Sequence, residues 1–308
     1  MKQQTIRREI TFKGTGLHTG HPVEMHILPA PEGYGICFQR TDVQKQPVIP
    51  AQACYVAHTN RSTVLALDGA EVGTTEHLLA ALYGMGIDNA HINLNGPEVP
   101  ILDGSAWPFA LALKDTGVVV QQEERTYFTP QTPIFYEEKD TGTSIIVIPA
   151  PVFSVGMLVD FTPRLVGKQG FYYSSAIDFL QDLAPARTFV FLDEVLPLLK
   201  KGLIKGGDMD NALVIADQEV DAADMRLLQM LFKDSARHLH TGYINKEGLR
   251  FPNECARHKT VDLLGDLMLA GKRLHALVAA HKPGHKANVA VARMIRNQCL
   301  DNESSAKI

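Results

Sequence analysis

The feature that most constrains the fold is an approximate internal repeat. The segment Ile27-Leu-Pro-Ala-Pro31 and the strand-like residues after it recur as Val147-Ile-Pro-Ala-Pro151 followed by residues 155–161. In each half a helical pattern that carries a histidine comes next, with His77 in the first half and His258 in the second. A glycine expected to end the helix, Gly271 in the second half, and a further strand pattern follow. Self-similarity of this kind indicates that one supersecondary unit is used twice. We therefore expect two related α+β units.

The spacing of the two copies predicts how the chain divides. The distance from proline to histidine is 48 residues in the first half (Pro29 to His77) and 109 in the second (Pro149 to His258), so the second half carries an insertion. The polar stretch 121–125 suits a linker, which predicts domains over residues 1–122 and 126–308. The expected fold class is α+β, with two related two-layer domains packed face to face. Helices would be sandwiched between two outer β-sheets, with a small insert in each domain.

Composition excludes several classes of protein. With 45% hydrophobic and 21% charged residues, the chain resembles an ordinary soluble globular protein. A net charge of −4 gives no reason to expect nucleic-acid binding, and no apolar run reaches membrane-spanning length. The four cysteines form no Cys-x-x-Cys pair, which argues against a disulfide framework and a thiolate zinc site. The N-terminal residues lack the apolar core of a signal peptide. The scattered cysteines lead us to expect a protein of the reducing cytoplasm.

A polar ladder marks the helical pattern of the second half. His258, Asp262 and Asp266 are four residues apart, so on a helix they lie one turn above each other on one face. An imidazole and a carboxylate one turn apart can bind one cation, while the second carboxylate orients another group. The alternative is a solvated stripe on an amphipathic helix, and only a partner histidine favours the metal site.

The first half supplies a candidate partner at the start of its helix. A threonine N-cap precedes Glu76 and His77, and glycines at 84 and 86 end the helical pattern. Adjacent helical residues point about 100° apart, so Glu76 and His77 would flank an ion rather than bind it alike. The helix N-terminus favours an ionised Glu76, as a general base requires. The alternatives are dipole compensation for Glu76 and a surface role for His77.

Together the two helices predict a metal centre. Two histidines and one carboxylate suit a tetrahedral catalytic zinc with one position open for water. Glu76 is then placed as general base, Asp266 as the carboxylate that orients a histidine, and His285 can enter from a following loop. The three expected ligands are His77, His258 and Asp262.

Several motifs in the same order give the chain a specific resemblance. They are Gly16-Leu17-His18-Thr-Gly20, Thr75-Glu76-His77, Leu102-Asp103-Gly-Ser105, Ala186-Arg187-Thr188-Phe189, Gly206-Gly207, Arg257-His258-Lys259-x-x-Asp262-x-x-Gly-Asp266 and Gly284-His285. From about residue 5 to about 297 the chain resembles the UDP-3-O-acyl-N-acetylglucosamine deacetylases, zinc enzymes of the committed step of lipid A synthesis in Gram-negative bacteria. The resemblance implies two α+β domains with helices between two sheets, in agreement with the repeat.

The resemblance also implies roles for individual residues. His77, His258 and Asp262 would bind Zn²⁺, and Glu76 would take the proton of the attacking water. The Thr188 hydroxyl would help to hold the oxyanion. His285, kept protonated by Asp266, would offset that charge.

Further residues are expected to bind substrate. Lys259 is similar to a family lysine near the nucleotide diphosphate and would point off the polar ladder; the alternative is a surface lysine. We also expect contacts from Thr63 and His18. By resemblance, the insert at about 189–213 forms an acyl-chain passage, although its apolar residues would otherwise be read as ordinary core. The expected passage residues are Phe189, Leu192, Val195, Ile204 and Ala212.

The chain departs from the family pattern between residues 217 and 250. This extra segment is predicted to form a short amphipathic helix and a loop, in which His238 and His240 could bind metal but are better explained as surface residues. The overall prediction is a monomeric zinc deacetylase acting on an acylated UDP-N-acetylglucosamine, with no nucleic-acid partner. The alternatives are another zinc amidohydrolase on the same scaffold and a non-catalytic binding protein of the same fold.

Overall fold

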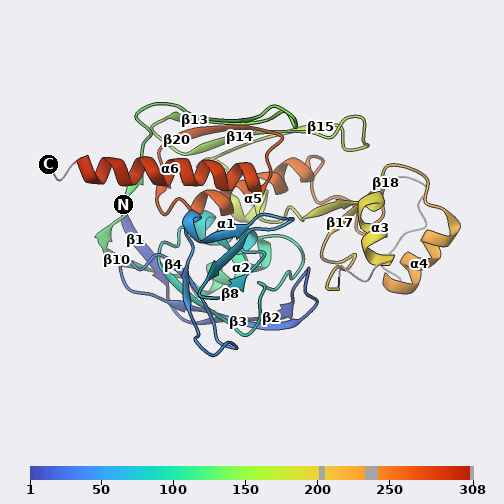
Figure 1. Cartoon of the computed structure of the whole chain (residues 1–308), viewed down its shortest axis with the longest axis horizontal. Helices are drawn as coiled ribbons and strands as arrows, with labels where there is room; N and C mark the ends of the chain where they lie inside the picture. Colours follow the sequence, from blue (N-terminus) through green and yellow to red (C-terminus); the bar gives the residue numbers. More distant parts are fainter. Residues whose placement is uncertain (201–204, 233–241, 306–308) are drawn as a thin grey trace.

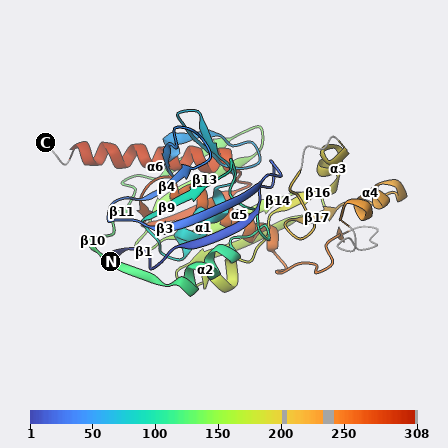
Figure 2. The same ribbon diagram turned by 90° about the horizontal axis from the view of Figure 1, so that it is seen from below.

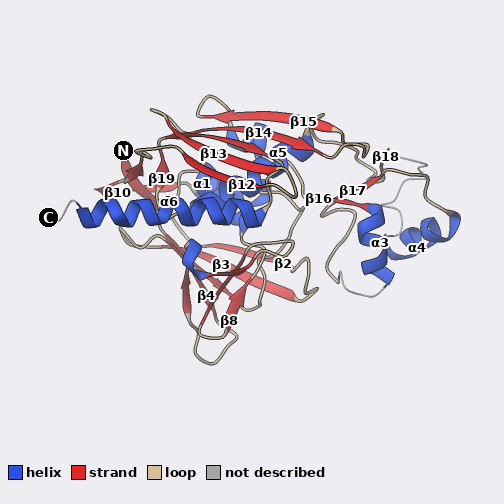
Figure 3. Ribbon diagram, turned by 45° about the horizontal axis from the view of Figure 1, so that its top comes forward, coloured by secondary structure: helices blue, strands red, loops and turns tan. Residues whose placement is uncertain are grey.

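Two five-stranded β-sheets form the outer layers of the molecule, and helices fill the space between them (Figures 1 and 3). The computed structural model describes residues 1–200, 205–232 and 242–305. In chain order the first half contains β1 (Lys2–Ile6), β2 (Ile10–Thr15), β3 (Pro22–Pro29), β4 (Ile36–Arg40), β5 (Val48–Pro50), the 3-10 turn Ala53–Tyr55, β6 (Val56–His58), β7 (Val64–Leu67), β8 (Ala70–Val72), α1 (Glu76–Gly84), β9 (Ala90–Leu94), α2 (Trp107–Thr116) and β10 (Val118–Glu124).

The second half repeats this order with longer additions. It contains β11 (Tyr127–Phe128), β12 (Ile134–Glu138), β13 (Thr143–Pro149), β14 (Ser154–Asp160), β15 (Lys168–Ser174), the π-helical turn Phe179–Leu183, β16 (Phe189–Phe191), α3 (Leu192–Lys200), β17 (Leu213–Ala216), α4 (Ala222–Phe232), β18 (Gly242–Tyr243), α5 (Glu254–Met268), β19 (Arg273–Leu274), β20 (Ala276–His281) and α6 (His285–Ser305).

Sheet topology confirms the repeat. The first sheet has the order β2-β3-β9-β4-β5 and the second has β12-β13-β20-β14-β15, so each strand has a counterpart in the same position. The pairing directions also agree, because β9 is antiparallel to β3 and parallel to β4, as β20 is to β13 and β14. The expected α+β class with two related units is therefore confirmed.

Each half carries an insert. In the first half, β6, β7 and β8 form a small antiparallel sheet between β5 and α1. In the second, β16, β17 and β18 form a three-stranded sheet that carries α3 and α4. This second insert projects from one end of the molecule, opposite the end at which α6 finishes (Figure 2). The expected helix in the extra segment is present as α4, whereas His238 and His240 lie outside the described residues.

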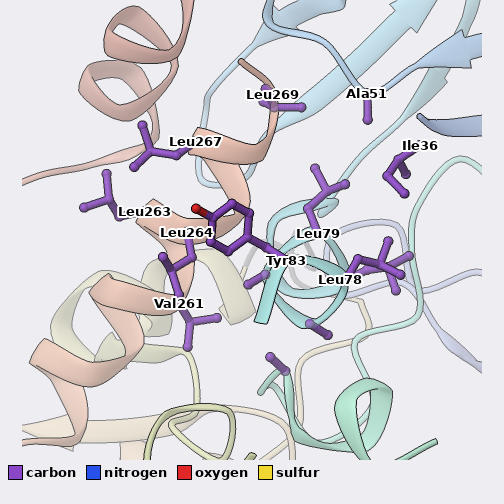
Figure 4. Packing of buried hydrophobic residues seen from close by; sticks show 14 of the residues in the cluster. Ile36, Ala51, Leu78, Leu79, Tyr83, Val261, Leu263, Leu264, Leu267 and Leu269 are labelled. Carbon is purple, nitrogen blue, oxygen red and sulfur yellow. The ribbon is translucent and has the colours of Figure 1, made fainter. Parts of the chain in front are cut away.

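The central helices α1 and α5 pack directly against each other between the sheets. Residues Glu76 to Tyr83 are all buried, so α1 is enclosed on every side, as a helix without a polar face should be. Tyr83 of α1 lies beside Leu264 of α5, with Val261 one turn away, whereas Leu78 lies on the side of α1 that is turned away from α5 (Figure 4). This contact joins the two halves and fixes where each helix presents its polar residues.

Gly265 of α5 permits an unusually close approach between the two helices. A Cβ atom at this position would lie 2.0 Å from the carbonyl oxygen of Glu76 and 2.9 Å from its Cα. Real Cβ atoms essentially never make contacts below 3.0 Å, so only glycine fits without moving a helix. The backbone of α1 therefore rests on α5 between Asp262 and Asp266, the two acidic positions of the ladder.

Two local expectations are wrong, and a third, the threonine N-cap, is confirmed in position but not in its hydrogen bond. The polar stretch 121–125 is not a free linker, because most of it lies in β10, which pairs with β1. Thr75 occupies the N-cap position of α1, but its hydroxyl donates to the carbonyl of Thr63 rather than accepting from a helix amide. Gly271, expected to stop the second helix, has a φ of +81° but lies three residues beyond the end of α5 at Met268.

Candidate metal centre

Three expected ligands meet where α1 crosses α5. His77 comes from the first turn of α1, and His258 and Asp262 lie one turn apart on α5. One candidate ligand atom from each residue lies within 4.8 Å of the others, and all three side chains are buried. The two imidazole rings are 5.0 Å apart between centroids and inclined by 77°. Two nitrogens and one carboxylate oxygen at this spacing form a ligand set that suits a metal ion.

Hydrogen bonds orient the ligand atoms toward a common point. Nδ1 of His258 lies 3.1 Å from the carbonyl oxygen of Ala186, which can only accept, so the proton is on Nδ1 and Nε2 has a free lone pair. That Nε2 is 3.2 Å from Oδ1 of Asp262, and Nε2 of His77 is 3.7 Å from the same oxygen. Among the described residues this buried Oδ1 has no hydrogen-bond donor. A buried carboxylate oxygen facing two imidazole nitrogens fits a bound cation.

Lys259 lies differently from the prediction. It was expected to point off the ladder, but its Nζ donates to Oδ2 of Asp262 at 2.8 Å. Residues three apart on a helix share a face, so this contact follows from ordinary helical geometry. Burial opposes its charge, but the neighbouring Asp262 carboxylate raises the pKa of Lys259. The ammonium group is thus held ionised beside the expected metal ligand, and it also lines the central cavity.

Glu76 and His285 face each other beside the ligands. Oε1 of Glu76 is 3.6 Å from Nε2 of His285. The helix N-terminus was expected to keep Glu76 ionised, but the opposite influence is larger, because burial raises the pKa of Glu76 to about 7. Burial alone would lower the pKa of His285, but the carboxylates of Asp266 and Glu76 raise it to about 10. The pair therefore combines a carboxyl group poised near neutrality with a cationic imidazole.

Asp266 orients His285, as the sequence predicted for a supporting carboxylate. Its Oδ2 accepts from Nδ1 of His285 at 2.8 Å and from the amide of Asn288 at 2.9 Å. Its Oδ1 accepts from the hydroxyl of Thr63 at 2.5 Å. Thr63 was expected to contact substrate, but it is fully buried and is not part of the cavity wall. Asn288 was not anticipated, although its position one turn beyond His285 on α6 could have suggested it.

A cavity of about 290 Å³ lies in front of these groups. Its polar wall includes Glu76, His77, His258, Asp262 and His285, and Thr188 also lines it. The rest of the wall comes largely from the second insert and is mainly apolar; it includes Phe189, Val190, Val195, Met209, Ala212, Val214 and Leu228. A polar centre that opens onto apolar side chains suits a ligand with both a reactive polar group and a hydrocarbon part.

The expected acyl-passage residues divide into three groups. Phe189, Val195 and Ala212 line the cavity. Leu192 does not; it belongs to a small apolar core of the second insert together with Leu196 and Ala216. Ile204 lies outside the described residues.

The turn that carries His18 is held in place by Glu98. The two carboxylate oxygens accept from the backbone amides of His18 and Thr19 and from the hydroxyls of Thr19 and Thr74. His18 lines the cavity, and burial lowers its pKa. Sequence reasoning did not single out Glu98, because nothing in the local pattern predicts that a residue 80 positions away fixes this turn.

Arg61 was also missed. Its side chain lines the cavity near His18. Its φ of +66° is in the left-handed region, which residues other than glycine adopt at an energetic cost, and such strain clusters at functional sites. The polar run around residues 60–63 was the only available signal.

The segment that carries Thr188 is anchored by a buried ion pair. Glu254, the first residue of α5, accepts from the backbone amide and the guanidinium of Arg187, with a shortest ionic contact of 2.8 Å. The same carboxylate accepts from the backbone amide of Arg250. These contacts fix the segment before β16, which presents the Ala186 carbonyl to His258 and places Thr188 at the cavity.

The described part of the chain contains no helix long and apolar enough to span a membrane. In the same part of the chain, Cys37, Cys54 and Cys255 form no disulfide bond.

Comparisons with known proteins agree on one family. The family model described as UDP-3-O-acyl N-acetylglycosamine deacetylase matches residues 3–238 and 234–297. The chain is 39% identical to the bifunctional enzyme LpxC/FabZ of Bacteroides thetaiotaomicron over 99% of its own length and 67% of that protein. It is 40% identical to the bifunctional enzyme of the same name from Chlorobaculum tepidum, over 98% of its own length and 65% of that protein. A UDP-3-O-acyl-N-acetylglucosamine deacetylase of Geobacter sp. (strain M21) is 40% identical, over 93% of this chain and 86% of that protein. The chain thus spans about two thirds of the bifunctional relatives.

Proposed function

The chain belongs to the family of UDP-3-O-acyl-N-acetylglucosamine deacetylases, and on this premise we propose that it hydrolyses the N-acetyl group of UDP-3-O-(3-hydroxyacyl)-N-acetylglucosamine with the help of one zinc ion. The products are acetate and the free amine, in the committed step of lipid A biosynthesis. The observation that carries the proposal is the meeting of His77 with His258 and Asp262 on the same cavity as Glu76 and His285.

His77, His258 and Asp262 would hold the zinc. The buried oxygen of Asp262 that lacks a donor and the free Nε2 of His258 both fit this role. The ion would supply Lewis acidity, which brings the pKa of a water molecule down toward about 7 and polarises a carbonyl group. The donor set also favours zinc over the hard cations Ca²⁺ and Mg²⁺, since two of the three atoms are imidazole nitrogens.

The remaining polar side chains would manage protons and charge. Glu76 would take a proton from the attacking water, a task that suits a carboxyl group whose pKa is about 7. His285, held by Asp266 and cationic at neutral pH, would offset the negative charge that develops on the amide oxygen. The Thr188 hydroxyl would donate to the same oxygen, because it lines the cavity next to the ligands.

The cavity also suggests how the substrate would lie. Its acyl chain would enter the apolar part of the wall formed by the second insert, where Phe189, Val195 and Ala212 are exposed to the cavity. The diphosphate would lie near Lys259 and His18, which line the same cavity. A nucleotide-sugar substrate and the absence of a Cys-x-x-Cys pair from the sequence favour the cytoplasm as the place of reaction. We propose that residues 1–122 and 126–308 form the two domains and that the protein is a monomer.

The test is acetate release from the acylated UDP-sugar by the full chain, before and after chelation and after addition of about one zinc per chain. Activity should be lost on chelation and restored by zinc. Glu76→Gln should keep the zinc and lose about 10²- to 10⁴-fold in kcat, as expected when a general base is removed. The matched control is Glu24→Gln, a surface residue of β3 that pairs with Lys13, which should retain full activity.

The possible outcomes separate the alternatives. No acetate release by a folded, zinc-loaded chain would refute the deacetylase assignment. Zinc-dependent cleavage of other amides without cleavage of the UDP-sugar would indicate a different amidohydrolase. Unchanged turnover in Glu76→Gln would remove Glu76 from the chemistry.

A further inference from the structure

Four residues at and behind the cavity wall form a closed ring of contacts. The backbone amide of Thr63 donates to Oε2 of Glu76 at 3.1 Å, and the Thr63 hydroxyl donates to Oδ1 of Asp266 at 2.5 Å. Oδ2 of Asp266 accepts from Nδ1 of His285, and Nε2 of His285 returns to Oε1 of Glu76 at 3.6 Å. In this ring each carboxylate uses both of its oxygens, one toward Thr63 and the other toward His285.

The members of the ring divide into two kinds. Glu76 and His285 line the cavity, whereas Thr63 and Asp266 are fully buried behind them. Thr63 precedes β7 in the insert of the first half, while Asp266 is on α5 in the second half. Thr63 therefore holds one carboxylate from each half at the same time, through two different atoms of one residue.

The position of Thr63 is itself fixed. Its carbonyl oxygen accepts from the backbone amide and the hydroxyl of Thr75, the residue before Glu76. Its hydroxyl is nearer to Asp266 than to Nδ1 of His285, at 2.5 Å against 3.4 Å. Among the described residues the Thr63 hydroxyl is the only side-chain donor to Oδ1 of Asp266. Without it the carboxylate would be held through Oδ2 alone, by Asn288 and His285, and its plane and the imidazole bonded to it would be less firmly fixed.

We propose that Thr63 is a positioning residue of this active site, which sets the placement of His285 relative to Glu76 by holding Asp266 and Glu76 together across the junction of the two halves. The inference rests on the proposed function, because it gives Glu76 and His285 their roles. Supporting hydrogen bonds of this kind typically change activity by about 10- to 100-fold when they are removed.

The test uses the zinc-loaded full chain with Thr63→Val, which removes the hydroxyl but keeps the size and the backbone amide that bonds Glu76. We expect kcat to fall about 10- to 100-fold, with KM and the zinc content unchanged. Thr63→Ser restores the hydroxyl and should recover most of kcat. Thr5→Val is the matched control, because Thr5 is buried and its hydroxyl accepts from the backbone amide of Ala30, in the first half; its kcat should stay at the wild-type value.

A double-variant comparison tests whether Thr63 acts through Asp266. In an Asp266→Asn background, Thr63→Val should cause little further loss, whereas independent, multiplicative losses would overturn the proposal. A wild-type kcat in Thr63→Val would also overturn the proposal. So would loss of zinc in Thr63→Val and in a second variant, Thr63→Ala, because Thr63 would then support the metal site as a whole and not the placement of His285. Absence of deacetylation in the wild type would instead refute the proposed function.

Discussion

Replacing Gly265 by alanine has opposite expected effects on the intrinsic stability of α5 and on its packing against α1, so the variant shows which effect is larger. In an isolated helix the change would stabilise the helical state by about 1 kcal/mol, because alanine is the better helix former. Here the new Cβ would lie 2.0 Å from the carbonyl oxygen of Glu76, about 1.4 Å short of the 3.4 Å at which ordinary van der Waals contact begins. The neighbouring atoms are backbone, so α1 or α5 has to shift by about that distance, and overpacking of this kind costs about 1–3 kcal/mol.

The displaced helix would carry Glu76 and His77 with it. A misplacement of about 1 Å can cost about 10²-fold in rate, so we expect kcat of Gly265→Ala to fall by about that factor and zinc affinity to weaken. Thermal unfolding, a zinc competition titration and acetate release measure the three effects. The control is Gly156→Ala in β14, where a Cβ meets nothing within 4 Å, which should be neutral or stabilising. A stabilised, fully active Gly265→Ala would refute the packing argument.

Three further predictions can be checked with single variants. Arg61→Gly removes a side chain from the cavity wall at a φ of +66°, which glycine adopts without strain. The stability of the fold should therefore stay the same or rise, while the KM for the anionic substrate should increase. An unchanged KM would show that Arg61 does not contact the substrate. Glu254→Ala leaves the buried guanidinium of Arg187 unpaired and should cost about 3–5 kcal/mol in denaturant unfolding; a loss below 1 kcal/mol would contradict this. Hydrogen bonds from Arg40 lower the pKa of Asp42 below 3.8. The ionised carboxylate therefore stabilises the folded protein above pH 3.8, and this stabilisation is lost as the pH falls through the lowered pKa. The free energy of unfolding of Asp42→Asn should depend less on pH below about 4 than that of the wild type, and equal acid sensitivity of the two proteins would contradict this prediction.

The sequence predicted the order of elements because the repeat is visible in its prolines, glycines and histidines. It also predicted that His77 and His258 would meet, since related units that face each other bring equivalent helix starts together. The pairing of residues 121–124 with β1 was not predictable, because the partner strand lies at the other end of the first half. The place of Leu192 in the insert core rather than on the cavity wall was not predictable either, since a helix face toward an insert core and a face toward a cavity have the same apolar pattern.

The electrostatics of the site were harder to predict than its composition. The position of Glu76 at a helix start indicates ionisation, but its burial, which raises the pKa to about 7, depends on α5 and on residues far along the chain. The salt bridge of Lys259 with Asp262 could have been foreseen from their spacing of three residues. The close approach at Gly265 could not, because a glycine within a helical pattern gives no indication of which backbone lies against it.

The three proposed zinc ligands come from both α1 and α5, so under the proposed function the metal would be acquired late in the synthesis of each polypeptide. During synthesis the ribosome releases His77 long before Asp262, and a single imidazole binds zinc weakly in a chain that is still unfolded. The ion can bind tightly only after α5 has emerged and docked on α1. Prematurely terminated chains that lack α5 would therefore neither bind zinc tightly nor react with substrate.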